Sequence, residues 1–194
     1  MSLDPFDSGM GPPPNLYRYR ENDERWTEKK YGDDILAVWQ MFDLPEDAVV
    51  THVTLIPYRG EKAVVAWRDG KNALPEGDLL PGESVDAAIK RIASEQAGIN
   101  DPVATHLGHL RSKATVNSTT QAQAPGTITY QALYGVEVGS ISDFPADPAY
   151  ERRILLQRDL NTLIRERYIF FRKEYAEALD HFLLDRLKAN LSGS

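Results

Sequence analysis

The residues whose types and spacing could do chemistry lie between Gly77 and Ile99. Arg91 and Glu95 are four positions apart in this stretch, which places them on one face of a helix. Such a pair stabilises a helix by only about 0.2–0.5 kcal/mol, so stability alone explains Glu95 poorly. Because magnesium prefers oxygen donors such as carboxylates, two interpretations of Glu95 stay open, a metal ligand and an exposed ion pair.

The stretch as a whole resembles the Nudix box. That box is a glycine, five free positions, a glutamate, seven free positions, and then Arg-Glu-aliphatic-any-Glu-Glu-any-Gly-aliphatic. The positions in register are Gly77, Glu83, Arg91, Glu95, Gly98 and Ile99. Ile92 and Gln96 stand where the pattern has glutamates, and Glu76 stands where a second glycine is usual.

The resemblance implies a hydrolase that uses Mg²⁺ or Mn²⁺ to cleave a nucleoside diphosphate linked to another group. Pyrophosphate carries clustered negative charge, so metal ions must neutralise it and lower the pKa of the attacking water. Carried over to this sequence, the catalytic residues would be Glu95, Arg91 and Glu83, with Glu83 orienting Arg91 and Glu95 holding metal. Gln96 could still coordinate weakly through its amide oxygen, whereas Ile92 cannot coordinate at all.

Residues outside the helix could complete such a site. Nudix proteins often take a metal ligand from outside the box, and the candidates here are Glu151 and Glu137, each of which could equally be a solvated surface acid. Arg68 follows a strand and could meet a phosphate, or it could simply end that strand in solvent. Gly77 would shape the loop that holds the substrate.

A helix is expected over Ser84 to Ala97, where it would carry the box residues. Ser84 is a suitable N-cap, Asp86 lies in the first turn, and Gly98 follows as a left-handed stop. At about 100° per residue, a sector of this helix roughly 60° wide holds Val85, Ile89, Ile92 and Gln96. We therefore expect Ile92 in an apolar stripe that packs against the sheet or a partner.

Apolar and β-branched runs between turn signals predict the strands. Val49 to Pro57 and Lys62 to Trp67 are expected to form a hairpin. Two further strands are expected over Val103 to Lys113 and Ile128 to Val138.

The segment between those last strands, Ser112 to Gly126, is small and polar without periodicity. It could cover a site or be a plain hairpin connection. His106 and His109 are three apart in a predicted strand, which places them on opposite faces. We therefore expect ordinary polar positions there rather than a metal-binding pair.

The ends of the chain flank this core. Residues 1–48 are expected to be an extension, flexible to about residue 15, that packs on the core with a short helix or strand around residues 35–42. Residues 49–194 would form the Nudix-like domain, including helices from Arg152 to Asn190. Apolar side chains there recur at helical spacing and could make core or homodimer contacts, namely Tyr168, Phe171, Tyr175, Leu179, Phe182 and Leu183. The element order matches the α/β/α sandwich with a mixed sheet that the resemblance implies.

The composition of the chain limits the classes of function that are possible. The chain has 194 residues, 42% of them hydrophobic, which suits one globular domain. A net charge of −7 argues against a general nucleic-acid or anionic-membrane surface. The absence of cysteine rules out disulfides and thiolate zinc sites, and no apolar run is long enough to span a bilayer, so we expect a cytoplasmic protein.

Two functions therefore stay open from the sequence. One is a Nudix-like hydrolase with an incomplete set of metal ligands, which would use Mg²⁺ or Mn²⁺. The other is a non-catalytic module of the same fold that binds a nucleotide or diphosphate ligand or another partner. Ile92 and Gln96 motivate the second, and the positions that remain in register motivate the first.

Overall fold

One mixed sheet dominates the fold. The computed structural model describes residues 29–31, 35–41, 43–60, 62–114, 124, 126–167, 177–182 and 184. In that part of the chain, nine strands lie in the order β1-β2-β8-β9-β3-β4-β11, with β5 beside β4 and β6 beside β3. Their bounds are β1 Lys29–Tyr31, β2 Ile35–Gln40, β3 Val50–Arg59, β4 Lys62–Arg68, β5 Lys71–Ala73, β6 Glu76–Asp78, β8 Val103–Ala114, β9 Ile128–Glu137 and β11 Glu151–Leu156. The small strands β7, Ile99–Asn100, and β10, Ser140–Ile141, pair separately.

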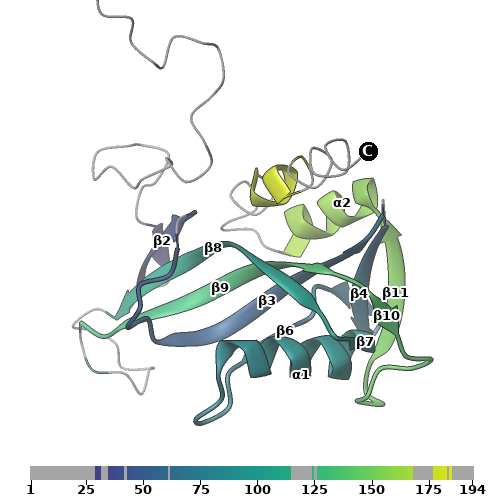
Figure 1. The fold of residues 1–194 in the computed structure, drawn as a ribbon. Coiled ribbons are helices and arrows are strands. Elements are labelled where there is room, and N and C mark those ends of the chain that lie inside the picture. The colour runs from purple at the N-terminus through teal and green to yellow at the C-terminus, as the bar shows by residue number, and fades with distance from the viewer. Residues whose placement is uncertain are drawn as a thin grey trace, which may run out of the picture.

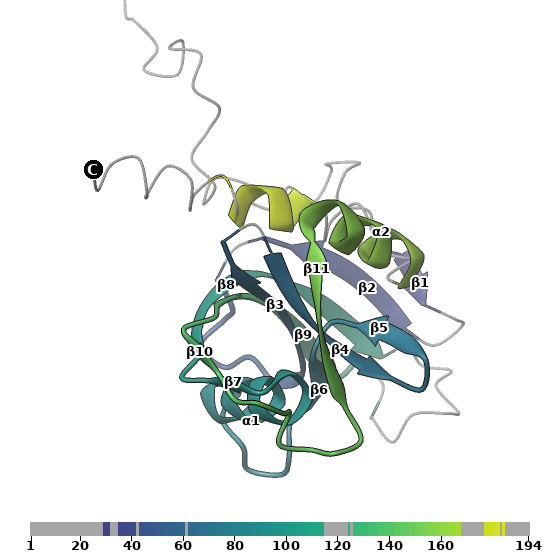
Figure 2. The ribbon, with the colours of Figure 1, turned by 90° about the vertical axis from the view of Figure 1, so that its right-hand side faces the viewer.

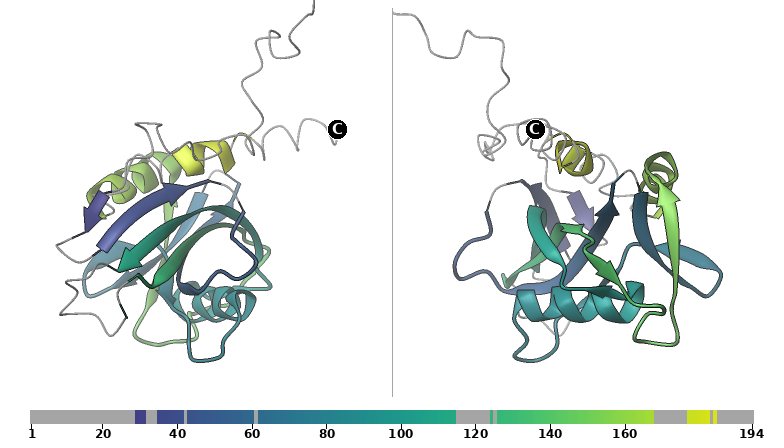
Figure 3. Two further views of the ribbon diagram at one scale, coloured as in Figure 1. Left: turned by 90° about the vertical axis from the view of Figure 1, so that its left-hand side faces the viewer. Right: turned by 45° about the vertical axis from the view of Figure 1, so that its right-hand side comes forward.

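Helices cover both faces of this sheet. Helix α1, Val85–Ala97, lies on one face, while α2, Gln157–Arg167, and the helical residues 177–182 lie on the other (Figures 1 and 3). Each face has its own apolar core, one built around α1 and one around α2. The expected α/β architecture, helices on both sides of a mixed sheet, is therefore confirmed. None of the described helices is long and apolar enough to cross a membrane.

The locally encoded elements follow the sequence closely. The expected hairpin is formed by β3 and β4, which pair antiparallel through Tyr58 and Ala63. Helix α1 begins after Ser84, whose Oγ accepts a hydrogen bond from the Ala87 N–H at 3.2 Å. It ends at Gly98, whose φ of 64° is the left-handed conformation that glycine adopts without strain.

The segment around residues 35–42, for which the sequence allowed a short helix or a strand, contains strand β2. Residues 35–40 are a strand that pairs antiparallel with β8, so this part of the predicted extension belongs to the sheet. Most of the predicted loop from Ser112 to Gly126 lies outside the described residues. Its first three residues, however, continue β8.

The prediction of helix from Arg152 onward was wrong for its first five residues. Residues 151–156 form β11, which pairs antiparallel with β4 at the edge of the sheet (Figure 2). Backbone pairing to β4 prevails there over the helical pattern, and α2 begins only at Gln157. Of the aromatic and aliphatic positions predicted in the terminal helices, Leu179 and Phe182 are buried in the core. Tyr168, Phe171, Tyr175 and Leu183 lie outside the described residues.

The placement of His106 and His109 on opposite faces was also wrong. The β8–β9 register shifts between His106 and Gly108, a bulge that adds one residue and turns both rings to the same side. Their rings stack with centroids 5.5 Å apart. Gly108 is required at this bulge, because a Cβ there would lie 2.5 Å from the Trp39 ring.

Candidate functional site

Strand β6 brings the start of the box against α1. Gly77 pairs with Val53 in β3, and a Cβ at Gly77 would lie 3.5 Å from Ile92 Cδ1. The box loop, residues 78–84, then leaves β6 and enters α1. The helix face that carries positions 92 and 96 therefore lies directly beneath Gly77.

Glu83 and Arg91 close the box loop. Arg91 Nε and Nη2 each donate to a Glu83 carboxylate oxygen at 2.8 Å, and Nη2 also donates to the Asp78 carbonyl at 2.9 Å. Glu83 additionally accepts from the Leu80 N–H at 2.9 Å. These bonds, first to Arg91 and then to Leu80, lower the pKa of Glu83 to about 2. The structure thus brings together the pair that the sequence placed in catalysis, in an arrangement that fixes the loop.

Glu95 is more accessible than Glu83, the other glutamate in register with the box. Its side chain is 42% exposed and lies 3.4 Å from Arg91 Nη1. That distance is long for a charge-assisted hydrogen bond, which is usually about 2.7–2.9 Å. Glu95 is therefore loosely held, and its metal-binding role stays a prediction.

Ile92 and Gln96 both have structural roles on the inner face of α1. Ile92 is fully buried in the apolar core with Val53 and Val136, as the predicted apolar stripe requires. Gln96 is 8% exposed, and both ends of its amide bind the backbone of Glu76. Its Oε1 accepts from the Glu76 N–H at 3.1 Å, and its Nε2 donates to the Glu76 carbonyl at 2.7 Å. To bind a metal as predicted, Gln96 would have to break both of these hydrogen bonds to Glu76.

The candidates outside the box contact their own surroundings. The Glu151 side chain is 72% exposed at the start of β11 and lies 3.8 Å from Arg153. Arg68 donates to the Tyr150 hydroxyl at 3.0 Å and lies 3.4 Å from Asp69. Glu137 is exposed at the end of β9. Their predicted roles in binding metal or substrate stay predictions.

Among the described residues, the donors near the box do not make up a magnesium or manganese site. Mg²⁺ demands near-octahedral oxygen coordination, usually with carboxylates among the ligands. Across the described parts of the chain, no three histidine or acidic side chains converge to hold a metal. At the box itself, Glu95 is accessible, whereas Glu83 and Gln96 are engaged by Arg91 and Glu76.

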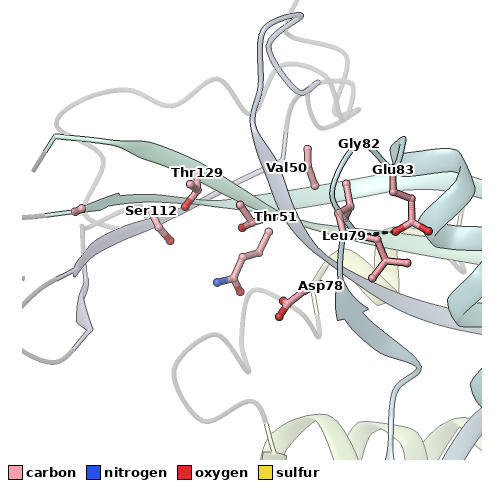
Figure 4. A pocket seen from close by; sticks show the side chains of 11 residues that line it. Val50, Thr51, Asp78, Leu79, Gly82, Glu83, Ser112 and Thr129 are labelled. Atoms are coloured by element: carbon pink, nitrogen blue, oxygen red, sulfur yellow. Dashed lines mark hydrogen bonds between the residues drawn. The ribbon is translucent and has the colours of Figure 1, made fainter. Parts of the chain in front are cut away.

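A cavity on the other side of the box loop was not predicted from the sequence. It has a volume of about 650 Å³ and lies between the loop and the ends of β3, β8 and β9 (Figure 4). Its lining residues are Val50, Thr51, Asp78, Leu79, Leu80, Gly82, Glu83, Ser112, Ala114, Thr129 and Gln131. The signal in the sequence was the alternation of small and polar residues at the ends of β8 and β9, where a core face would be apolar.

Carboxylates are the charged groups that line this cavity. Asp78 is 87% exposed and its Oδ1 lies 2.8 Å from His52 Nδ1. Glu83 is tied to Arg91. The lining residues of the described chain include no lysine or arginine. As far as the described residues line it, the cavity therefore offers hydrogen-bond acceptors and hydroxyls and no side-chain cation.

Comparisons with known proteins find similar structures and no matching sequences. No protein-family model and no curated protein matches the chain. One similar solved structure is a mutant of the Bacillus subtilis pyrophosphohydrolase BsRppH, with 18% identity and a TM-score of 0.49 over 66% of this chain and 77% of that one. Another is an ADP compounds hydrolase, with 13% identity and a TM-score of 0.43 over 84% of this chain and 91% of that one. At these identities the similarities say nothing of the ligand or reaction of this chain.

Proposed function

We propose that this chain is a Nudix-like binding module that holds a nucleotide-derived small molecule and has lost metal-dependent hydrolysis. The observation that supports it most is the inner face of α1. There Ile92 is part of the core and Gln96 binds the backbone of Glu76, at the two positions where the box has glutamates. The nucleotide class of the ligand rests on the resemblance of Gly77 to Ile99 to the Nudix box.

Both replacements stabilise the fold, which explains why the inner face can no longer serve a metal. Full burial of an isoleucine side chain contributes about 1.5–3 kcal/mol relative to leaving it exposed. The Gln96 amide satisfies a backbone donor and acceptor of β6 that would otherwise need other partners. A carboxylate at either place would have to be desolvated against Gly77 and Glu76, so the present arrangement is incompatible with the metal set that the family uses.

A residual hydrolase is the second candidate function, and one observation favours it. Glu95 is exposed beside an intact Glu83–Arg91 pair, in the positions that the resemblance gives to catalytic residues. Such an enzyme would need further oxygen ligands from the substrate or from water. We rank it second because a lone carboxylate is a poor magnesium site.

Binding and turnover measured side by side separate the two. Nucleoside diphosphates, sugar nucleotides and dinucleotides would be titrated by isothermal calorimetry in EDTA, and incubated with Mg²⁺ or Mn²⁺ for product analysis by chromatography. We expect saturable binding in EDTA and no product above the protein-free rate. Metal-dependent turnover that Glu95→Gln abolishes would overturn the proposal in favour of the hydrolase.

A further inference from the structure

The cavity beside the box loop points to a particular part of the ligand. Building on the proposed binding function, we propose that this cavity takes the neutral nucleoside portion, ring and sugar hydroxyls, and leaves any phosphate outside, without metal. The inference concerns which chemical groups the cavity recognises, so it can fail while the proposed function stands.

One wall of the cavity is built for hydrogen bonds to neutral groups. Ser112 and Thr129 lie directly opposite one another on β8 and β9, and both are more than nine-tenths buried, at 7% and 8% exposed. Thr51 donates its hydroxyl proton to the Tyr130 carbonyl at 3.4 Å, which leaves its oxygen to accept. Gln131 adds an amide on the same wall, and amides can pair with both a donor and an acceptor of a heterocycle. Figure 4 shows Thr51, Ser112 and Thr129 beside Asp78 around the same space.

The remaining walls suit a ring. Val50, Leu79, Leu80 and Ala114 supply apolar surface around the polar groups. A volume of about 650 Å³ is within the usual range for small-molecule sites, roughly 300–1,000 Å³. Sites for drug-sized or nucleoside-sized molecules combine apolar surface with a few placed polar groups, and this open cavity contains both.

The charges exclude phosphate from the interior. Asp78 presents a carboxylate that can accept hydrogen bonds from a sugar diol and would repel a phosphate. Arg91 does not compensate, because its guanidinium already binds Glu83, Glu95 and the Asp78 carbonyl. Lys113 lies between Ser112 and Ala114 on β8, and strand alternation turns it to the opposite face. Phosphate recognition would need a cation there, and the described lining offers none.

The experiment compares each ribonucleoside with its own 5′-diphosphate. Adenosine, guanosine, cytidine and uridine and the four diphosphates would be titrated by calorimetry in EDTA at two salt concentrations. We expect at least one nucleoside to bind as tightly as its diphosphate or more tightly, with affinity unchanged by Mg²⁺. A diphosphate that binds more than tenfold tighter than its nucleoside in EDTA would overturn this inference and leave the binding function standing. If none of the eight compounds binds, this inference fails, and the binding function is then decided by the sugar nucleotides and dinucleotides of its own test.

Two variants and one control variant locate the binding in this cavity. Thr129→Val keeps the shape and removes one hydroxyl, so nucleoside affinity should fall about three- to tenfold, as for one lost hydrogen bond. Thr105→Val makes the same change at an exposed position of β8 and should leave affinity unchanged. Asp78→Asn keeps an acceptor but removes the charge, so diphosphate affinity should rise relative to nucleoside affinity by about threefold or more. The assignment would be overturned if Asp78→Asn left the ratio of diphosphate to nucleoside affinity unchanged. Equal losses of nucleoside affinity in the two threonine variants would also overturn it.

Discussion

The two sides of the box loop have opposite properties. On the α1 side, Ile92 and Gln96 fill the space beneath Gly77 with apolar packing and backbone hydrogen bonds. On the sheet side, Ser112, Thr129 and their neighbours surround an open polar cavity. A loop can therefore keep its shape, through Glu83 and Arg91, while one of its sides becomes core and the other remains available to a ligand.

The largest effect is expected from restoring the glutamate of the box at position 92, on the α1 side of the loop. Ile92→Glu places a carboxylate in a fully buried apolar position, so the free energy of unfolding should fall by about 3–5 kcal/mol. Urea unfolding would measure it, with and without Mg²⁺. Lys90→Glu introduces the same residue at an exposed position of α1 and serves as the control. Recovery of the lost stability by Mg²⁺ would show that the α1 side of the loop is still a metal site.

Mild acid should destabilise the fold through His109, which belongs to neither the box loop nor the lining of the cavity. Burial lowers the pKa of His109 to about 4, with His106 adding to the shift. Because the unfolded chain takes up the proton at a pKa near 6.5, stability is full above that value and is lost as the pH falls toward 4. The loss should reach about 3 kcal/mol. Unfolding of the wild type and His109→Gln at pH 7 and pH 4.5 would measure it, and equal losses in both would contradict the assignment.

Loss of the Gln96 amide should loosen β6. Gln96→Ala leaves the Glu76 N–H and carbonyl without these partners, at a cost of about 1–3 kcal/mol. Amide hydrogen exchange at Glu76 should accelerate, while exchange in β9 should not. Ser94→Ala, on the less buried side of α1, is the matched control. Unchanged protection of Glu76 would show that Gln96 is not needed to hold β6.

The smallest effect is expected from the ion pair of Glu83 and Arg91, which holds the box loop between its two sides. The pKa of Glu83 is lowered to about 2, so its pairing with Arg91 stabilises the fold fully above pH 4.5 and is lost as the pH falls toward 2. Glu83→Gln should lower Tm modestly at pH 7, and the difference from wild type should shrink in acid. A difference that is independent of pH would mean that the charge of Glu83 contributes nothing.

Local signals made the central part of the fold predictable. Ser84, Gly98 and the apolar stripe with Ile92 fix α1 through neighbours within a few positions, and the β3–β4 hairpin turns within a few residues. Strand β11 was missed because its conformation depends on pairing with β4, about 88 positions earlier in the chain. The His106–His109 stack was missed because a single bulge reverses the alternation that a regular strand would keep.

In the candidate site, too, the features encoded locally were predictable and those that depend on distant residues were not. The ion pair of Glu83 and Arg91 follows from a motif within one loop and one helix. The role of Gln96 depends on Glu76, which lies 20 positions before it, so no local pattern revealed it. The cavity depends on the meeting of β8, β9 and the box loop, and the sequence carried only the weak signal of small polar residues at two strand ends.

Metal binding by the wild-type protein is the direct test of whether the box still holds a metal ion. Mn²⁺ would be titrated into the purified protein and followed by electron paramagnetic resonance, with Glu95→Gln and Glu151→Gln measured alongside. We expect no saturable one-to-one site up to millimolar metal, and no difference among the three proteins. Stoichiometric binding in the wild type that Glu95→Gln abolishes and Glu151→Gln preserves would show that the α1 side of the loop is still a metal centre.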